Sequence, residues 1–324
     1  MRAIIPVAGV GSRLRPHTFT IPKVMLSVAG KPIIGHIMDK IIADGITEAT
    51  IIIGYLGDLV KEYIDQNYKI PVDYVEQEER LGLGHAIYLA KQTISTSPIL
   101  IILGDTIFDV DLKKMISSEH SSIGVHKVDD ARRFGVVEVK DGFISKLVEK
   151  PDNPKSDLAI VGIYFIKNPQ LLLNCLENNI NKNITTKNEF QLTDGLQQLL
   201  ENGEKIIPFN IDGWYDCGKP ETLLLTNQHL LMNAKNHYAI PTVITIPPVY
   251  ISPKAVVQNS IIGPNTSISE DCKISNCIIS NSIINNMAQV QNVLLESSII
   301  GTNAVVDGKF RRVNIGDSSE LEFN

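Results

Sequence analysis

The sequence lacks several features that mark common classes of protein. No apolar run approaches the roughly 20 residues that a helix needs to cross a bilayer, and the N-terminus reads as a strand without a cleavage pattern. The formal net charge of -6 argues against nucleic acid or an anionic membrane as the main partner. We therefore expect no membrane or nucleic-acid partner and a cytoplasmic location.

Cysteine and histidine are also scarce. The four cysteines have no paired CxxC spacing, which argues against zinc or a disulfide framework and for reduced, buried thiols. The seven histidines show no ligand spacing, and no Ser/His/Asp or Cys/His arrangement is visible. His36 and His85 fall on expected helices, where a surface or packing role is the simpler interpretation.

What is present is the composition of a globular protein: 324 residues, 44% hydrophobic and 20% charged, enough for about two domains. Strand and helix patterns alternate up to about residue 236, with apolar strands expected at 3–7, 49–53, 72–75 and 99–103 and a helix at 32–44. This alternation predicts parallel strands covered by helices, with ligands at the carboxyl ends of the strands. Between 122 and 166, closely spaced strands predict an antiparallel insertion that forms a side wall of the pocket.

After His237 helix formers disappear, and single aliphatic residues recur in steps of five or six. These positions are Val256, Ile262, Ile268, Ile274, Ile279, Ile284, Val290, Leu295, Ile300 and Val306. The spacing is typical of a hexapeptide parallel β-helix, and a disordered tail would not explain ten positions in phase. We predict a catalytic domain at 1–236 and a β-helix at 237–324, whose edge favours a homo-oligomer.

The segment from Ile4 to Lys23 predicts a phosphate site. An apolar strand leads into a turn of small residues, whose backbone N–H groups can approach an anion, and Arg13 and Lys23 follow. The pattern is neither a Walker A loop nor a dinucleotide fingerprint. A plain turn is the alternative for Gly9-x-Gly11 alone.

Two acids follow expected strands: Asp105 in ILIILGDTIFD and Asp216 in GWYDCGKPE. Two carboxylates from separate strand ends can hold one Mg²⁺, with phosphate oxygens and water as further ligands. The alternative for Asp216 is a helix cap. Gln77, followed by Gly82, can pair with a base edge, although an ordinary loop would look the same. Glu149 and Lys150, expected to face opposite ways at a strand end, could hold sugar and phosphate or form a surface ion pair.

These segments together resemble the sugar-1-phosphate nucleotidyltransferases, and most closely the long form of glucose-1-phosphate thymidylyltransferase. The matching segments, in order, are AGVGSRLRPHTFTIPK, LGLGHAIYLAK, LGDTIF, FGVVEVKDG, LVEKP, LAIVGIYFI, NEFQLTDGLQQLL and GWYDCGKPETLL, and the tail ends in FRRVNIGDSSELEF. The resemblance implies an α/β fold, a Rossmann-like mixed-sheet sandwich of the nucleotidyltransferase type, followed by a left-handed parallel β-helix. Ser12 in place of Thr, and Pro6-Val7-Ala8 at the strand end, depart from the family pattern.

The resemblance also implies roles for individual residues. The catalytic residues would be Arg13, Lys23, Asp105 and Asp216, with Asp105 and Asp216 holding Mg²⁺. The nucleotide would contact Ala8, Gly9, Gly11, Ser12, Arg13, Gln77 and Gly82, and the last two would read the pyrimidine. The sugar and its phosphate would contact Gly135, Glu149 and Lys150.

The expected reaction joins a nucleoside triphosphate, dTTP in the first place, to a sugar 1-phosphate, with glucose 1-phosphate as the first choice, and releases pyrophosphate. A uridylyltransferase is the nearest alternative, because uracil and thymine differ by one methyl. A guanylyltransferase would need a wider pocket. An acyltransferase would rely on a histidine in the β-helix, and none follows His237. A non-catalytic regulatory subunit would tend to lose the cations or the carboxylates, which are all present.

Overall fold

The computed structural model describes residues 1–232 and 238–309. The chain divides into two compact units, Met1–Thr226 and Asn227–Asn324. The predicted boundary at 236/237 and the closing motif at 310–323 lie outside the described residues, so both stay predictions. Among the residues that are described, no helix is long and apolar enough to cross a membrane.

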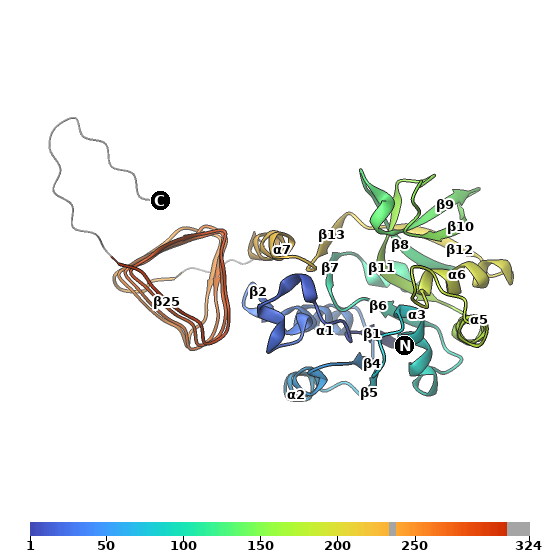
Figure 1. Ribbon diagram of the computed structural model, residues 1–324, viewed down its shortest axis with the longest axis horizontal. Helices are drawn as coiled ribbons and strands as arrows, with labels where there is room; N and C mark the ends of the chain where they lie inside the picture. Colours follow the sequence, from blue (N-terminus) through green and yellow to red (C-terminus); the bar gives the residue numbers. More distant parts are fainter. Residues whose placement is uncertain (233–237, 310–324) are drawn as a thin grey trace. The chain divides into compact units, whose positions relative to one another are not determined.

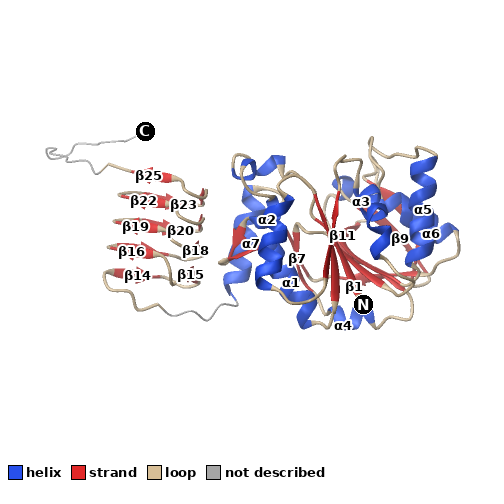
Figure 2. Cartoon of the chain, turned by 90° about the horizontal axis from the view of Figure 1, so that it is seen from below, coloured by secondary structure: helices blue, strands red, loops and turns tan. Residues whose placement is uncertain are grey.

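A mixed nine-stranded sheet forms the centre of the first unit (Figures 1 and 2), in the order β10-β9-β11-β6-β1-β4-β5, with β8 pairing with both β11 and β12. The strands are β1 Arg2–Pro6, β4 Glu48–Ile53, β5 Val72–Glu76, β6 Ile99–Ile102, β8 Ser121–Lys127, β9 Gly135–Lys140, β10 Phe143–Glu149, β11 Leu158–Ile166 and β12 Ile206–Asn210. The expected parallel set is confirmed, because β1 is parallel to β4 and β6, and β4 to β5. The expected antiparallel strands are confirmed, since β11 pairs antiparallel with β6, β8 and β9, and they continue the central sheet.

Helices cover both faces of the sheet. Figure 2 shows α1 and α2 on one face and α3, α5 and α6 on the other. The helices are α1 Ile33–Ala43, α2 Gly57–Asn67, α3 Leu83–Leu89, α4 Leu112–Ile116, α5 Pro169–Asn181, α6 Leu192–Glu201 and α7 Pro220–Met232. The helix predicted at 32–44 is α1, and its apolar stripe is buried, as helical periodicity requires. Two short ribbons complete the unit: β2 (Ser27–Val28) with β3 (Lys31–Pro32), and β7 (Thr106–Asp109) with β13 (Gly213–Asp216).

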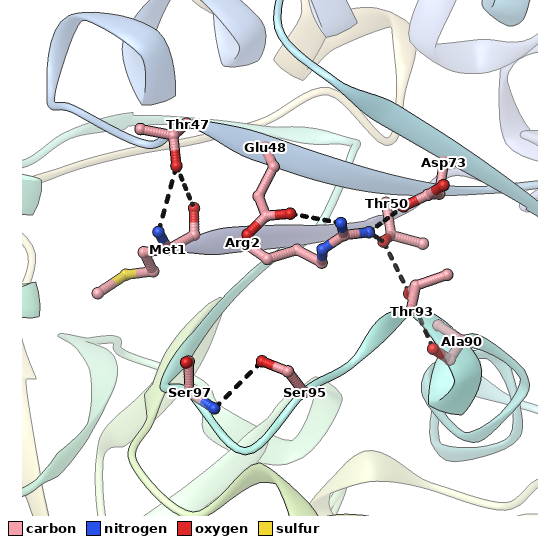
Figure 3. Close-up of polar contacts among 10 residues, drawn as sticks. All are labelled: Met1, Arg2, Thr47, Glu48, Thr50, Asp73, Ala90, Thr93, Ser95 and Ser97. Atoms are coloured by element: carbon pink, nitrogen blue, oxygen red, sulfur yellow. Dashed lines mark hydrogen bonds and ion pairs between the residues drawn. The ribbon is translucent and has the colours of Figure 1, made fainter.

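One guanidinium ties three parallel strands together at their amino ends (Figure 3). Arg2 of β1 pairs with Glu48 of β4 and Asp73 of β5, and it donates to the Thr50 hydroxyl at 2.9 Å. The Arg2 side chain is only 16% exposed. These contacts lie at the amino edge of the sheet, opposite the carboxyl edge where ligands of parallel α/β sheets bind.

The second unit contains a left-handed parallel β-helix, whose triangular cross-section is visible in Figure 1 and whose stacked coils are visible in Figure 2. It has three sheets of four parallel strands, β14-β17-β20-β23, β15-β18-β21-β24 and β16-β19-β22-β25. Their bounds are β14 Val243–Thr245, β15 Val249–Ile251, β16 Val256–Gln258, β17 Ser260–Ile262, β18 Thr266–Ile268, β19 Lys273–Ser275, β20 Ile278–Ser280, β21 Ile283–Ile284, β22 Gln289–Gln291, β23 Leu294–Glu296, β24 Ile299–Ile300 and β25 Val305–Asp307.

The predicted aliphatic ladder is correct except at its first position. Val256 is 53% exposed, whereas its neighbour Val257 is 5% exposed and in register with Ile274. The other predicted positions belong to, or pack against, the core of the coil. Spacing alone did not decide between two adjacent valines, because both are apolar.

Asparagine stabilises the corners between the short strands. Asn259, Asn276 and Asn292 stack along one corner with positive φ of 47°, 54° and 58°. Asn259 donates to the side-chain oxygen of Asn276 at 3.4 Å, and Asn276 donates to that of Asn292 at 3.1 Å. Asparagine tolerates the left-handed region better than most residues, which explains the Asn-rich composition. The expected self-association of the β-helix stays a prediction.

Candidate active site

The loop that follows β1 (residues 7–22) folds back on Lys23. The Thr18 hydroxyl donates to the Gly11 carbonyl at 2.8 Å, and Gly11 has a left-handed φ of 63°. A Cβ on Gly11 would come within 2.9 Å of the Lys23 Cβ, so this close approach requires glycine. At Gly9 a Cβ would meet nothing within 4 Å. The backbone at Gly9 is therefore open to a ligand.

Lys23 forms an ion pair with Asp105. The distance between Lys23 Nζ and Asp105 Oδ2 is 2.6 Å, and the side chains are 8% and 38% exposed. Burial raises the pKa of the Asp105 carboxyl, but the charge of Lys23 and its hydrogen bond outweigh burial, so the net shift is downward. Asp105 is thus held ionised, as a ligand for a cation must be.

The two predicted metal ligands come together through the β7–β13 ribbon. In this antiparallel pair Thr106 lies opposite Asp216, and the Cys217 N–H donates to the Asp105 carbonyl at 2.9 Å. The ribbon therefore places Asp105 and Asp216 at the same end of adjacent strands. The helix-cap alternative for Asp216 is wrong, because Asp216 is the last residue of β13 and α7 begins only at Pro220.

The cations face the same carboxylates. Burial raises the pKa of Asp216 and the nearby charge of Asp105 adds to this rise, while Lys23 and Arg13 oppose it. A Cβ on Gly218 would lie 2.8 Å from an Asp216 carboxylate oxygen and 2.9 Å from the Arg13 guanidinium. Arg13, Lys23, Asp105 and Asp216 therefore form one charged cluster.

A cavity of ≈ 330 Å³ lies beside this cluster, within the size range of small-molecule sites. Of the predicted residues, those that line it are Ala8, Gly9, Lys23, Gln77, Gly82 and Asp105. Those outside the lining are Gly11, Ser12, Arg13, Asp216, Gly135, Glu149 and Lys150. Pro6, Val7 and Ala8 line the cavity, so this departure from the family pattern falls on the cavity wall.

Gln77 and Gly82, predicted to read the base, are in contact. The Gln77 amide nitrogen donates to the Gly82 carbonyl at 3.1 Å, and the Gln77 side chain is buried. The same nitrogen lies 3.3 Å from Nδ1 of His85. The sequence predicts a surface or packing role for His85 and gives no sign of this polar contact.

The predicted sugar-phosphate residues form a separate cluster at the ends of β9 and β10. Glu149 accepts a hydrogen bond from Thr193 at 2.6 Å, and its second oxygen lies 3.1 Å from Lys150 Nζ. A Cβ on Gly135 would lie 3.0 Å from the Glu149 carboxylate. The expectation that Glu149 and Lys150 face opposite ways is wrong: Lys150 follows the strand with a φ of 41°, and its side chain contacts Glu149.

Two further residues lie beside predicted site residues although sequence reasoning did not select them. Thr193, 5% exposed, holds the Glu149 carboxylate. Tyr164 of β11 is buried, and its pKa is raised by burial and then by the charges of Glu149 and Asp105. Tyr164 therefore lies within electrostatic range of both clusters. Both residues stand inside quoted segments, LAIVGIYFI and NEFQLTDGLQQLL, but only their spatial neighbours distinguish them from core residues.

The donor set fits a magnesium ion that arrives with a phosphorylated substrate. Within residues 1–232 and 238–309, no group of three or more His, Cys, Asp or Glu could hold a metal ion by itself. Asp105 and Asp216 provide two carboxylates, and Mg²⁺ commonly takes one or two carboxylates and completes its shell with phosphate oxygens and water.

Comparison with known proteins identifies the family of the chain. The model of the nucleotidyl transferase family matches residues 2–233. The chain belongs to this family. The bifunctional protein GlmU of Methanococcus maripaludis is 37% identical over 235 residues, covering 71% of this chain but 54% of GlmU, so the chain spans little more than half of that relative.

Two other similarities bear on the fold. Glucose-1-phosphate thymidylyltransferase of Streptomyces antibioticus is 28% identical over an alignment of 360 positions that covers 99% of both chains. The crystal structure of UDP-glucose pyrophosphorylase complexed with UDP-glucose has a TM-score of 0.64 and 27% identity, over 72% of this chain and 99% of that one. The predicted resemblance to sugar-1-phosphate nucleotidyltransferases is confirmed, as are the mixed α/β sheet and the β-helix. The roles of the individual site residues stay predictions.

Proposed function

We propose that the chain catalyses Mg²⁺-dependent transfer of a nucleotidyl group from dTTP to glucose 1-phosphate, which yields a nucleotide sugar and pyrophosphate. The observation that carries the proposal is the cluster of Arg13, Lys23, Asp105 and Asp216 beside the cavity. The thymidylyltransferase relative, aligned over 99% of both chains, supports dTTP and glucose 1-phosphate as the first substrates to test. The product would supply glycan or glycoconjugate synthesis.

In the proposed reaction, an oxygen of the sugar phosphate attacks the α-phosphorus. The new P–O bond forms as the bond from the α-phosphorus to the bridging oxygen breaks, and its electron pair leaves with pyrophosphate. A phosphate monoester has a second pKa of about 6, so the nucleophile is mostly dianionic at pH 7 and needs no general base. The charged cluster accordingly needs no histidine.

The residues of the chain act by position and charge. Lys23 and Arg13 would hold the triphosphate and neutralise charge on the leaving group, which is the main demand of phosphoryl chemistry. Asp105 and Asp216 would hold Mg²⁺, which when bound supplies further positive charge to the phosphates. Glu149, fixed by Thr193, would bind sugar hydroxyls.

Uridylyl transfer is the second candidate, and the UDP-glucose pyrophosphorylase structure favours it. A pocket discriminates a single methyl by only about 1–3 kcal/mol. Use of both dTTP and UTP is therefore compatible with the same site.

The test measures pyrophosphate release with four nucleoside triphosphates against several sugar 1-phosphates, with and without Mg²⁺. We expect release with dTTP or UTP and glucose 1-phosphate, and loss of at least about a hundredfold in Asp105→Asn. Asp129→Asn, at an exposed acid, is the matched control and should keep full activity. Absence of pyrophosphate for every pair would contradict the proposal and favour a regulatory subunit of this fold.

A further inference from the structure

The orientation of the Gln77 amide is fixed by its neighbours. The Gly82 carbonyl, 3.1 Å from Gln77 Nε2, can only accept a hydrogen bond. The amide NH₂ must therefore face this carbonyl, because the flipped amide would set two oxygens against each other. The second N–H of the same group points to His85 Nδ1 at 3.3 Å.

These two contacts use the donors of Gln77 and leave its carbonyl oxygen. Gln77 lines the cavity and, within the described residues, its side-chain oxygen has no protein partner. This oxygen can only accept. Uracil and thymine carry a donor at N3–H, whereas cytosine has an acceptor at N3, which would face the oxygen unfavourably.

We propose that His85 is a positioning residue for base recognition: its Nδ1 holds the Gln77 amide with the carbonyl oxygen free for N3–H of uracil or thymine, and thereby disfavours cytosine. The inference rests on the proposed function, because it assigns the cavity to the base of the nucleotide. It goes further by naming the group that sets the hydrogen-bond polarity of the site.

The role requires a neutral imidazole with its proton on Nε2. Burial lowers the pKa of His85, and Glu79 opposes this shift. The ring of Phe190, with its centroid 6.5 Å from that of His85, adds no charge, and Arg80 and Glu189 line the same cavity. Protonation would place a donor at Nδ1 against the Gln77 NH₂ and remove the support for this orientation.

The experiment measures kcat and KM for UTP, dTTP and CTP at saturating glucose 1-phosphate and Mg²⁺. In His85→Ala we expect KM for UTP and dTTP to rise about three- to tenfold, the range of one hydrogen bond. We expect kcat to stay within about twofold, since the group does not touch reacting atoms. The preference for UTP over CTP should fall by a similar factor.

His85→Asn is the matched variant, because its side-chain oxygen can accept near the place of Nδ1 and does not titrate. It should restore KM and the preference at pH 7. On lowering the pH from about 7.5 to 5.5, protonation of His85 should raise the wild-type KM for UTP relative to that of His85→Asn. Titration of the phosphates affects both proteins equally and cancels in this comparison. This comparison also serves if His85→Ala does not fold.

The outcomes separate the inference from the proposed function. Wild-type preference for UTP or dTTP over CTP, with no change in His85→Ala, would leave the function standing and overturn the inference. Equal defects in His85→Asn and His85→Ala would also overturn it. If no nucleotide and sugar phosphate react, equilibrium binding of UTP and CTP to the wild type, His85→Ala and His85→Asn measures the preference for UTP instead. The inference is overturned if this preference is the same in all three proteins. Preference for ATP or GTP would overturn both proposals.

Discussion

Replacement of Lys23 by methionine tests the charged cluster at its centre. Methionine keeps an unbranched apolar chain in the buried position and removes only the ammonium group, which lies 2.6 Å from Asp105. If Lys23 neutralises charge in the transition state, turnover should fall by at least about 10²–10³-fold, as for the loss of one preorganised donor. The loss should appear in kcat as well as in kcat/KM.

The same substitution has a calculable effect on stability. Removal of one partner of a fully buried pair costs about 3–5 kcal/mol. The Asp105 side chain, however, is 38% exposed, so solvent screens its charge, and we expect a loss of about 1–2 kcal/mol. Lys127→Met is the control: its pair with Asp157 at 3.0 Å has side chains 77% and 52% exposed, and the loss should stay within about 0.5 kcal/mol.

The pH dependence of this loss has a definite sign. In the wild type the folded pKa of Asp105 is lowered, so its contribution is present above the unfolded value of about 3.9 and is lost as pH falls through the folded pKa. Without Lys23, burial still raises the pKa of Asp105, and only the hydrogen bond from the Thr106 hydroxyl and a backbone hydrogen bond oppose it. The carboxylate then destabilises the variant at neutral pH, and acid relieves this. The difference in unfolding free energy should therefore shrink from pH 7 to pH 3.

The assay is urea unfolding of both variants and the wild type at several pH values, together with pyrophosphate release. Addition of Mg²⁺ without nucleotide should raise the melting temperature of Lys23→Met more than that of the wild type, because Asp105 no longer has its lysine partner. Near-normal turnover would remove Lys23 from the proposed chemistry. A stability difference that grows on acidification would refute the electrostatic reasoning.

Three further substitutions probe other parts of the chain. Gly218→Ala would place a Cβ 2.9 Å from the Arg13 guanidinium and should lower kcat about tenfold or more with little change in melting temperature. Unchanged kinetics would contradict the placement of Arg13 beside the loop between β13 and α7. Ile279→Ala removes a fully buried side chain and should lower the free energy of unfolding by about 2–5 kcal/mol. Ile278→Ala changes a neighbour that is 47% exposed and should lower it by no more than about 0.5 kcal/mol. Hydrogen exchange across the coils would measure the contrast, and equal effects would contradict the assigned register. Arg2→Met should lower the free energy of unfolding by about 1–2 kcal/mol, because two part-exposed carboxylates lose their partner. The values of kcat and KM should stay unchanged, and a change in either would show that the amino edge of the sheet affects the candidate site.

The fold was largely predictable because its signals are local. Alternation of strand and helix in the first part of the chain, and one aliphatic position every five or six residues in the last part, are visible in short windows of the sequence. The predictions were wrong where the local sequence allowed two structures equally well. Val256 and Val257 are both apolar, so only pairing with Ile274 decides which one enters the core. Likewise, strand alternation predicts that Lys150 faces away from Glu149, but Lys150 lies past the end of β10 at a positive φ.

The site was predictable where a residue follows a strand, and not where it acts through a neighbour. Asp105 and Asp216 stand at strand ends, so the sequence selects them as candidates, but their proximity depends on the long-range pairing of β7 with β13. Thr193 and His85 carry no signal of their own, because each matters only through a hydrogen bond to Glu149 or Gln77. Such positioning residues become visible only when the packing is known.

The pairing of Lys23 with Asp105 also constrains how substrates can bind. With a net charge of -6 the chain does not attract anions as a whole, so the phosphates depend on a few local cations. One of these, Lys23, is already shared with a carboxylate. A cation that takes over Asp105 would free Lys23 for the triphosphate, and the triphosphate would in turn supply oxygens that two carboxylates alone cannot. By linkage each ligand must raise the affinity of the other by the same factor. Under the proposed function, cooperative binding of ion and nucleotide would thus follow from a site in which the lysine is already paired with one of two neighbouring acids.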